Sequence, residues 1–424
     1  MNPSNKFTRV IFCTLLTAVF LLTASSRPVG AITSSTERQE VSDKDIIADY
    51  EATQLNPSLS EDEKIKAAIN AYFASRYESQ KILNNIDFSP VLENATSTWA
   101  NEEKEKREIE IYIANLFSLR YQTYSYSLDY DTIRITPSEA IVSLRESHEV
   151  VFEVLSPDVS KMSGLKHEIT LHKKQNKWVI FKDDYQDELS QLMNHKTRNE
   201  IILQVNRNYQ EDLKLRATDS SHEAAMSYFG SKTLFSPSYH PLLLNNYGYN
   251  RTKARNYADA YWDTYNTDWY KTASGTDCTN YVSQALYAGE GKTPPDTGGM
   301  TTASNRSCQY DWYYIWNNSG SLPWVRVQSQ YNFIVNNTNK IGPADVRSNN
   351  LCSVRLGDIV QLYDVNGAAI WDHEAIFVES PYPYCQSSSY YKVNAHTTNR
   401  YHYPLSNWAA YQMRYILIRG WKVN

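Results

Sequence analysis

The 424-residue sequence has little net charge, few cysteines and, after its first thirty or so residues, no long hydrophobic run. Its 42 Lys and Arg residues nearly balance its 47 Asp and Glu residues, and the formal net charge is −5. A nucleic-acid-binding protein concentrates Lys and Arg on one domain, so we expect no nucleic-acid partner. Because a second apolar stretch of roughly 20 residues is missing, we expect no membrane-spanning helix beyond the N-terminus.

Sequence patterns that bind metal ions are also missing. There is no His-Glu-x-x-His segment, and the spacings of Cys and His match no zinc-binding pattern. The chain also lacks internal repeats and low-complexity tracts. We therefore predict neither a metal nor a cofactor.

The N-terminal segment, residues 1–31, has the organisation of a secretory signal. Lys6 and Arg9 precede an apolar stretch at 10–24, and Ala31 supplies a small residue for cleavage. This pattern predicts an exported protein, secreted or held at the cell surface, with no stable membrane span once the signal is removed. An uncleaved N-terminal anchor is the alternative interpretation.

Length and composition predict two domains. With 42% hydrophobic residues, the chain has a globular composition and is too long for one core. Residues 32–59 are rich in Ser, Thr, Asp and Glu without apolar periodicity, and we expect a linker there. We place an accessory domain at 60–217 and a second domain at 218–424, where Tyr, Trp, Asn and Ser become frequent while Lys and Glu become rarer.

The accessory domain is predicted to have an α+β fold, with helices ahead of an antiparallel sheet. Ser60 and Glu63 form a capping-box pattern before one helix, and residues 96–120 have the spacing of a second. Alternating segments then predict strands at 132–135, 140–144, 149–155, 168–172 and 178–181. This order of elements is similar to the cone-shaped fold of the nuclear-transport-factor-two superfamily.

The end of the accessory domain returns to helical spacing, over residues 184–216. Three histidines, His148, His167 and His172, fall in its strand segments without a partner cysteine or a carboxylate pattern. We therefore expect no second active site in this domain, which would serve as a positioning, binding or inhibitory module.

Cys278 lies in a different sequence context from the other cysteines. The apolar residues that follow it recur on one helical face: Tyr281, Val282, Ala285 and Leu286. Cys278 is then in the first turn of a helix, where Thr276 or Asp277 can act as the cap and the helix dipole favours thiolate over thiol. The sequence predicts an activated nucleophile, and a small buried structural cysteine is the alternative.

Segments typical of antiparallel strands follow this helix, at 358–363, 373–379, 390–396 and 415–419. If the second and third pair with Ser380 opposite Ser389, His373 lies directly opposite His396, with Cβ atoms about 5 Å apart. A slip of one residue would send the two rings to opposite faces of the sheet.

The chemistry of a cysteine hydrolase requires three groups. These are a thiol, an imidazole that moves the thiol proton, and a polar group that orients the imidazole. Cys278, His373 and His396 supply all three, so we predict them as the catalytic residues. For the two histidines, a hydrogen-bonded strand residue and a turn cap are the respective alternatives.

The chain resembles the amidase domain family of bacterial exported proteins, a group placed with the papain-like cysteine peptidases near the NlpC-type and CHAP cell-wall hydrolases. The resemblance covers residues from about 245 to 420 and is carried by these segments: Tyr249-Asn250-Arg251, Asp277-Cys278-Thr279-Asn280-Tyr281-Val282-Ser283-Gln284, Gly357-Asp358-Ile359-Val360-Gln361, Trp371-Asp372-His373 and Ala395-His396-Thr397. It implies an α+β domain in which a helix bearing the cysteine packs on an antiparallel sheet.

The same resemblance implies a role for each predicted site residue. Cys278 corresponds to the nucleophile, His373 to the general base and acid, and His396 to the orienting residue on the next strand. Glu374 departs from the family pattern, which usually has Ser after the histidine. Because Glu374 points to the opposite strand face from His373, we expect a changed neighbour rather than lost chemistry.

The predicted activity is hydrolysis of an amide bond through a thioester on Cys278, with backbone N–H groups at the helix start holding the oxyanion. Tyr270 is a candidate for an additional oxyanion donor, as tyrosines are in related cell-wall peptidases. Export and the resemblance imply a peptide or amide substrate from the cell wall, such as peptidoglycan. Acyl transfer to an amine instead of water fits the sequence equally well.

The cysteines also define a competing hypothesis. Apart from Cys13 in the signal, the chain has Cys278, Cys308, Cys352 and Cys385. If all four pair in disulfides, the chain is better explained as a non-catalytic secreted protein that binds a surface or a glycan through its aromatic residues. If Cys278 is free, the other three allow one disulfide and one further thiol, which the sequence does not assign.

Overall fold

The structure is a computed structural model that describes residues 43–228, 248–266, 277–292, 300–315, 319–348 and 350–423. The predicted signal and the first part of the predicted linker lie outside these ranges. Within them, no helix combines the length and apolar character needed to cross a lipid bilayer.

The first half of the described chain contains helices and an antiparallel meander, as predicted, with four strands in place of the five expected. Its α-helices are α1 (Asp43–Leu55), α2 (Glu61–Ile82), α3 (Thr98–Phe117), α4 (Glu188–Met193) and α5 (Arg198–Tyr228). Its strands are β1 (Tyr121–Ile135), β2 (Glu139–Phe152), β3 (Val159–Lys174) and β4 (Lys177–Tyr185). The predicted capping box is confirmed: the Ser60 amide donates to the Glu63 carboxylate at 2.8 Å, and the Glu63 amide donates to Ser60 Oγ at 3.3 Å.

Two features of this half differ from the sequence expectation. Helix α1 lies where the linker was expected, because Ile46, Tyr50 and Gln54 recur every four residues and are all buried. The segments expected as separate strands at 140–144 and 149–155 belong mostly to β2. A shift in its pairing with β3, after Glu146, interrupts the alternation of buried and exposed residues without ending the strand.

The second half surrounds the predicted nucleophile with short helices and further strands. Its α-helices are α6 (Arg251–Ala260), α7 (Asp277–Gly289), α8 (Leu322–Val325) and α9 (Val327–Asn336). Its strands are β5 (Tyr314–Ile315), β6 (Ser319–Gly320), β7 (Gly342–Ser348), β8 (Ile359–Tyr363), β9 (Trp371–Glu379), β10 (Lys392–Ala395), β11 (Asn399–Pro404) and β12 (Gln412–Lys422). The four predicted strands are confirmed as β8, β9, β10 and β12, whereas β7 and β11 were not predicted.

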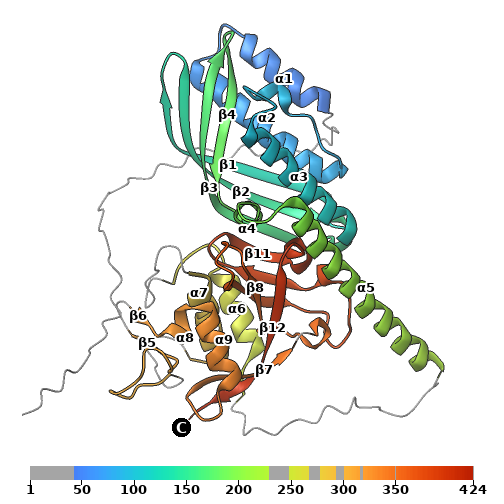
Figure 1. The fold of residues 1–424 in the computed structure, drawn as a ribbon, viewed down its shortest axis with the longest axis vertical. Coiled ribbons are helices and arrows are strands. Elements are labelled where there is room, and N and C mark those ends of the chain that lie inside the picture. The colour runs from blue at the N-terminus through green and yellow to red at the C-terminus, as the bar shows by residue number, and fades with distance from the viewer. Residues whose placement is uncertain are drawn as a thin grey trace, which may run out of the picture. The chain divides into compact units, whose positions relative to one another are not determined.

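One antiparallel sheet runs through both halves (Figure 1). Its strand order is β1-β2-β3-β11-β10-β9-β8-β12-β7, with β4 also paired to β3. The two halves join where β11 pairs with β3, with Asn399 opposite Ser163 and Tyr401 opposite Lys161. The predicted domain boundary at residue 218 falls within α5. This is an α+β fold with a large antiparallel sheet, as the sequence predicts.

The central strands of the second half are buried on both faces. On one face, Ile376 and Val378 of β9 pack with α6, α7 and α9. On the other, Ala375 and Phe377 of the same strand pack in a cluster that includes residues of α3 and α5. The apolar side chains of β9 therefore alternate between packing with α6, α7 and α9 and packing with α3 and α5.

The predicted register between β9 and β10 is wrong by one residue. Val393 lies opposite Phe377, and Asn394 lies opposite Ile376. The connection is longer than the expected pairing of Ser380 with Ser389 allows, because it contains a 3₁₀-helix, Ser388–Tyr390, and the pairing shifts after Lys392. As a result, His373 packs on the face of Trp408 and His396 packs on the face of α7.

Candidate active site

Helix α7 holds the predicted nucleophile in its first turn and packs on β9, in agreement with the sequence prediction. Cys278 is 6% exposed and is a free thiol, whereas Cys352 and Cys385 form a disulfide. Cys308 lies outside that bridge. The prediction of one disulfide with Cys278 free is therefore confirmed, and the arrangement with all four cysteines paired is not the one in the structure.

Cys278 and His373 line the same cavity, which has a volume of about 380 Å³. Its walls come from α4, the first turn of α7, the end of α8 and the start of α9, the loop between β8 and β9, the start of β9 and the turn after β10. Thr279, Trp371 and Asp372 line it beside these two residues in sequence, and Thr397 and Thr398 line it from the segment that follows His396. This cavity is the candidate active site.

The Cys278 thiol is protonated in this arrangement. Burial, followed by the negative charge of Glu374, raises its pKa to about 12. The Thr279 hydroxyl lies 3.8 Å from Sγ, and this group and the backbone N–H of Glu374 oppose the shift by hydrogen bonding to the sulfur. The expectation that the helix dipole favours the thiolate here is wrong, because desolvation and a neighbouring carboxylate dominate.

Glu374 is a site residue whose position the sequence did not indicate. It is fully buried, and its Oε2 atom accepts a hydrogen bond from Gln361 at 2.6 Å. Burial raises the pKa of Glu374 to about 8, against the lowering effects of Gln361 and Arg414. The departure from the resembled family therefore introduces an ionisable group beside the predicted nucleophile.

His373 is buried and presents a free ring nitrogen. Its ring packs edge-on against Trp408, with centroids 5.6 Å apart, and its Nε2 atom has no hydrogen-bond partner in the described part of the chain. Burial lowers the pKa of His373 and outweighs the opposing charge of Glu188. The ring is therefore neutral near pH 7, which is the form a general base needs.

His396 contacts the residue before the predicted nucleophile, and its two ring nitrogens bind groups other than His373. Its Nδ1 atom lies 2.5 Å from Asp277 Oδ2, and its Nε2 atom donates to the carbonyl oxygen of Tyr261 at 2.6 Å. The ring stacks on Tyr281 at a centroid distance of 3.9 Å. His396 therefore fixes the start of α7 from the turn after β10.

Asp277 was expected to cap backbone N–H groups of α7, yet its carboxylate binds two side chains. Oδ2 pairs with His396, and Oδ1 accepts from Asn280 Nδ2 at 3.0 Å. The alternative cap, Thr276, and the proposed oxyanion donor, Tyr270, lie outside the described residues.

The N-terminal segment of the resembled family ties α6 to the sheet. Arg251 donates to the Leu356 carbonyl oxygen at 2.5 Å and to the Asp358 carboxylate at 2.7 Å. Tyr249 donates to the Gly357 carbonyl oxygen at 2.8 Å. Gly357 has φ +75°, and its Cα faces the Tyr249 ring so closely that a Cβ would meet the hydroxyl at 2.6 Å.

The histidines of the first half do have carboxylate partners, contrary to the sequence expectation. His167 lies between Asp183, at 2.9 Å, and Glu146, at 3.3 Å. Burial opposes the shift, but these carboxylates raise the pKa of His167 to about 9. His172 pairs with Glu93 at 2.7 Å. The partners come from other strands and loops, so local sequence patterns could not identify them.

Among the residues that the structure describes, no group of three or more His, Cys, Asp or Glu side chains is arranged to hold a metal ion. The candidate site itself contains a thiol, an imidazole and a carboxylic acid, those of Cys278, His373 and Glu374.

Comparison with known proteins relates the second half of the chain to amidases. Residues 248–418 match the family model described as "Putative amidase domain". The matched stretch contains Cys278, His373 and His396 and covers less than half of the chain. It indicates amidase-type hydrolysis of C–N bonds.

The other comparisons add no functional argument. No curated protein matches the chain. One solved structure, the crystal structure of the Kfla4162 protein from Kribbella flavida, is 10% identical, with 30% of this chain and 91% of that chain covered. Its TM-score of 0.21 is too low to relate the two folds.

Proposed function

We propose that this protein is an exported, cysteine-dependent amidase that hydrolyses C–N bonds through a thioester on Cys278. One observation carries the proposal: the Cys278 thiol, at the start of α7, lines the same cavity as His373. The amidase-family match to residues 248–418 supports the reaction class. The lone Nε2 atom of His373 supports its role as the proton acceptor.

In the first step, Cys278 Sγ attacks the amide carbonyl carbon while His373 Nε2 accepts the thiol proton. The C–N bond then breaks, and His373 returns the proton to the leaving amine. In the second step, water attacks the thioester carbonyl and gives a proton to His373. The C–S bond then breaks, the Cys278 sulfur takes up that proton from His373, and a carboxylic acid is released.

The raised pKa of Cys278 defines when the proton moves. Because burial and Glu374 keep the thiol protonated, the enzyme does not rest as a thiolate–imidazolium pair. Proton transfer to His373 accompanies the attack, and the lowered pKa of His373 keeps its ring available as a base. Backbone N–H groups at the start of α7 stabilise the oxyanion.

His396 has a positioning role in this proposal. Its short contact with Asp277 and its bond to the Tyr261 carbonyl oxygen hold the first turn of α7 against β10. Both ring nitrogens of His396 are engaged by these two groups, so His396 orients the nucleophile through Asp277 rather than orienting the ring of His373.

The proposed substrate is a peptide or amide bond of the cell wall, such as one in peptidoglycan. Export is supported by the signal-like N-terminus and by the Cys352–Cys385 disulfide, since disulfides persist in oxidising compartments. We propose a papain-like arrangement for residues 218–424, which is supported by the packing of the cysteine-bearing helix on an antiparallel sheet. We propose a cone-like fold for residues 60–217, which is supported by the packing of α2 against β1 and β4.

The test is a search for the acyl-enzyme. The mature protein is incubated with cell-wall peptides, quenched with acid and mapped by mass spectrometry, and we expect an acyl adduct on Cys278. Cys278→Ala should abolish both the adduct and the released amine, whereas the matched control Cys308→Ala should retain both. Unchanged amide hydrolysis by Cys278→Ala would rule the proposal out. If an amine is added to the reaction and becomes joined to the acyl product, the enzyme transfers the acyl group to an amine instead of water.

A further inference from the structure

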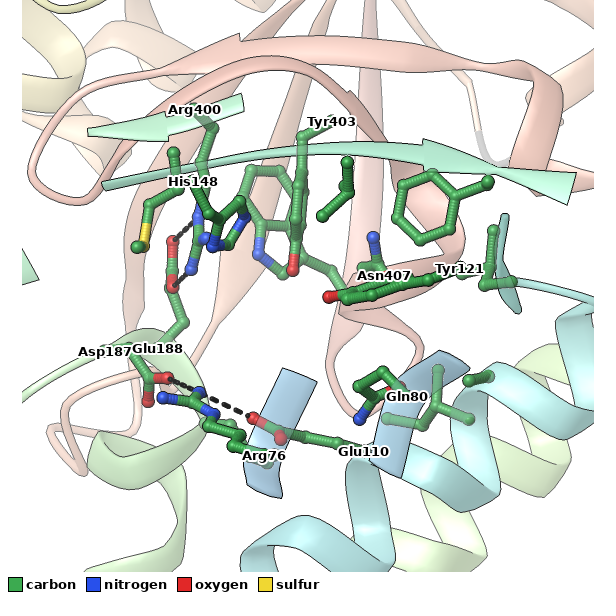
Figure 2. A pocket seen from close by; sticks show the side chains of 18 of the residues that line it. Arg76, Gln80, Glu110, Tyr121, His148, Asp187, Glu188, Arg400, Tyr403 and Asn407 are labelled. Carbon is green, nitrogen blue, oxygen red and sulfur yellow. Dashed lines mark hydrogen bonds and ion pairs between the residues drawn. The ribbon is translucent and has the colours of Figure 1, made fainter. Parts of the chain in front are cut away.

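Helix α4 belongs to the first half of the chain, yet it forms part of the Cys278 cavity. Glu188 and Gln191 of this helix line that cavity together with Cys278 and His373. Glu188 also lines a second cavity, of about 100 Å³, where the first half meets β11 (Figure 2). Within the described residues, no other side chain lines both cavities. The first half of the chain therefore contributes a carboxylate to the candidate active site.

The carboxylate of Glu188 is held in place by a buried cation. Arg400 of β11 donates to it at 2.7 Å and 3.4 Å, and each of the two side chains is 7% exposed (Figure 2). The preceding residue, Asp187, begins α4 with a capping box, in which its carboxylate accepts from the Ser190 amide at 2.8 Å. Lys106 of α3 binds the same Asp187 carboxylate at 2.7 Å. These contacts fix Glu188 at the wall of the Cys278 cavity.

The predicted general base, His373, lacks a hydrogen-bonded anion. In a triad of this kind, the third group orients the imidazole and stabilises the imidazolium that forms when the ring takes up a proton. Nε2 of His373 has no hydrogen-bond partner within the described residues, and His396 binds Asp277 and the Tyr261 carbonyl oxygen instead. Trp408 packs on the ring of His373 and restricts its orientation. The remaining requirement is a negative charge that stabilises the imidazolium.

Glu188 is the charged group with the largest effect on His373. Burial lowers the pKa of His373 most strongly, and among the charged groups Glu188 raises it, Asp372 raises it less, and Arg400 lowers it. Glu188 is 5% exposed, so little water screens its charge. The thiol of Cys278, which titrates in the same cavity, is uncharged because burial raises its pKa to about 12. The negative charge that His373 requires is therefore supplied mainly by Glu188.

We propose that Glu188 is a positioning residue that acts through His373: its buried carboxylate stabilises the imidazolium that forms when Cys278 gives up its proton. Arg400 holds this carboxylate in place from β11. The inference rests on the proposed function, in which His373 accepts the thiol proton. It gives the first half of the chain a defined role, because α4 then completes the catalytic site instead of belonging to a separate module.

The proposal is tested on the full mature chain carrying Cys278→Ala, so that the measurement does not depend on hydrolysis. The His373 ring is titrated by NMR, and its resonances are assigned by their loss in His373→Ala. Glu188→Gln should move the titration midpoint of His373 to lower pH by about one unit, the low end of the effect of a nearby charge. Glu188→Asp keeps the charge and should retain the midpoint. Glu110→Gln is the matched control, because Glu110 pairs with Arg76 and lines only the second cavity (Figure 2).

Loss of one member of a buried ion pair can also destabilise the fold. Circular dichroism therefore accompanies each variant, and the double variant Glu188→Gln/Arg400→Gln, which removes both charges, is measured alongside. It should also lower the midpoint, by less than the single variant, because the effect of Glu188 on His373 exceeds that of Arg400. With Cys278 intact, Glu188→Gln should lower kcat by up to about tenfold, the equivalent of one pKa unit.

Two results would overturn this inference. One is equal midpoints for Glu188→Gln and Glu110→Gln, and the other is a His373 ring that stays unprotonated at every pH at which the Cys278→Ala protein is folded. A midpoint lowered by Glu188→Gln in a protein that hydrolyses no amide would instead overturn the proposed function and leave the action of Glu188 on His373 intact.

Discussion

Asp277 Oδ2 and His396 Nδ1 lie 2.5 Å apart, so the residue before the proposed nucleophile is bound to the turn after β10, more than a hundred positions later. The opposite ring nitrogen of His396 binds the Tyr261 carbonyl oxygen. The start of α7 is therefore held by a charge-assisted contact that was not apparent from the sequence, and its strength can be measured.

Asp277→Asn should slow amide hydrolysis and destabilise the fold by about 1.5–3 kcal/mol, the range for a hydrogen bond to a charged group. The amide of this variant has one acceptor oxygen, whereas the carboxylate binds His396 through Oδ2 and Asn280 through Oδ1. A double-mutant cycle with His396→Gln, read by urea unfolding and by kcat, should show strong coupling. Additive effects of the two substitutions would contradict a direct functional contact.

His373→Ala should lower kcat by about 100- to 10,000-fold, the usual contribution of a general acid–base group. The protein should still fold, because the Nε2 atom makes no hydrogen bond within the described residues. His172→Ala is the matched control, since His172 lies on β3 in the first half of the chain and pairs with Glu93 there. Full activity in His373→Ala would show that another group is the general base.

Glu374→Gln should accelerate alkylation of Cys278 by iodoacetamide at pH 9. Above its pKa of about 8, Glu374 is charged and disfavours the thiolate, whereas Gln carries no charge. We expect an increase of at least about threefold, since nearby charges shift a pKa by one unit or more. At pH 6 both proteins carry a neutral group and should react alike.

The matched control for this experiment is Glu379→Gln on the same strand. Glu379 pairs with Lys392 and His402 at the other end of β9, so its loss should leave the alkylation rate of Cys278 unchanged. Peptide mapping follows Cys278 separately from Cys308. Equal rates for wild type and Glu374→Gln at pH 9 would show that the carboxylate does not act on the thiol.

Glu374 should also make the stability of the fold depend on pH. Its pKa rises from about 4.5 in the unfolded chain to about 8 in the folded protein, so the folded state binds the extra proton between these values. The resulting stabilisation is complete below pH 4.5 and is lost as the pH rises towards 8. Urea unfolding at pH 5 and pH 8 should show a larger loss for wild type than for Glu374→Gln, and parallel losses would contradict the prediction.

The sequence predicted local features well where periodicity and caps specify them. The Ser60 capping box, the α7 helix and strands β8, β9, β10 and β12 follow from residue spacing within one element. Helix α1 was missed because its apolar residues are few, and β11 because its sequence is polar and it pairs with β3 from the other half.

By itself, the sequence determined that a cysteine begins a helix ahead of histidine-bearing strands, because local spacing encodes the type of an element. Only the tertiary structure decided which side chains meet the sulfur. The β9–β10 register places Glu374 and His396 towards α7, whereas His373 packs against Trp408 and shares with Cys278 the cavity that both residues line. Pairing between strands depends on a long connection whose geometry the local pattern does not specify, and a shift of one residue reverses every side chain.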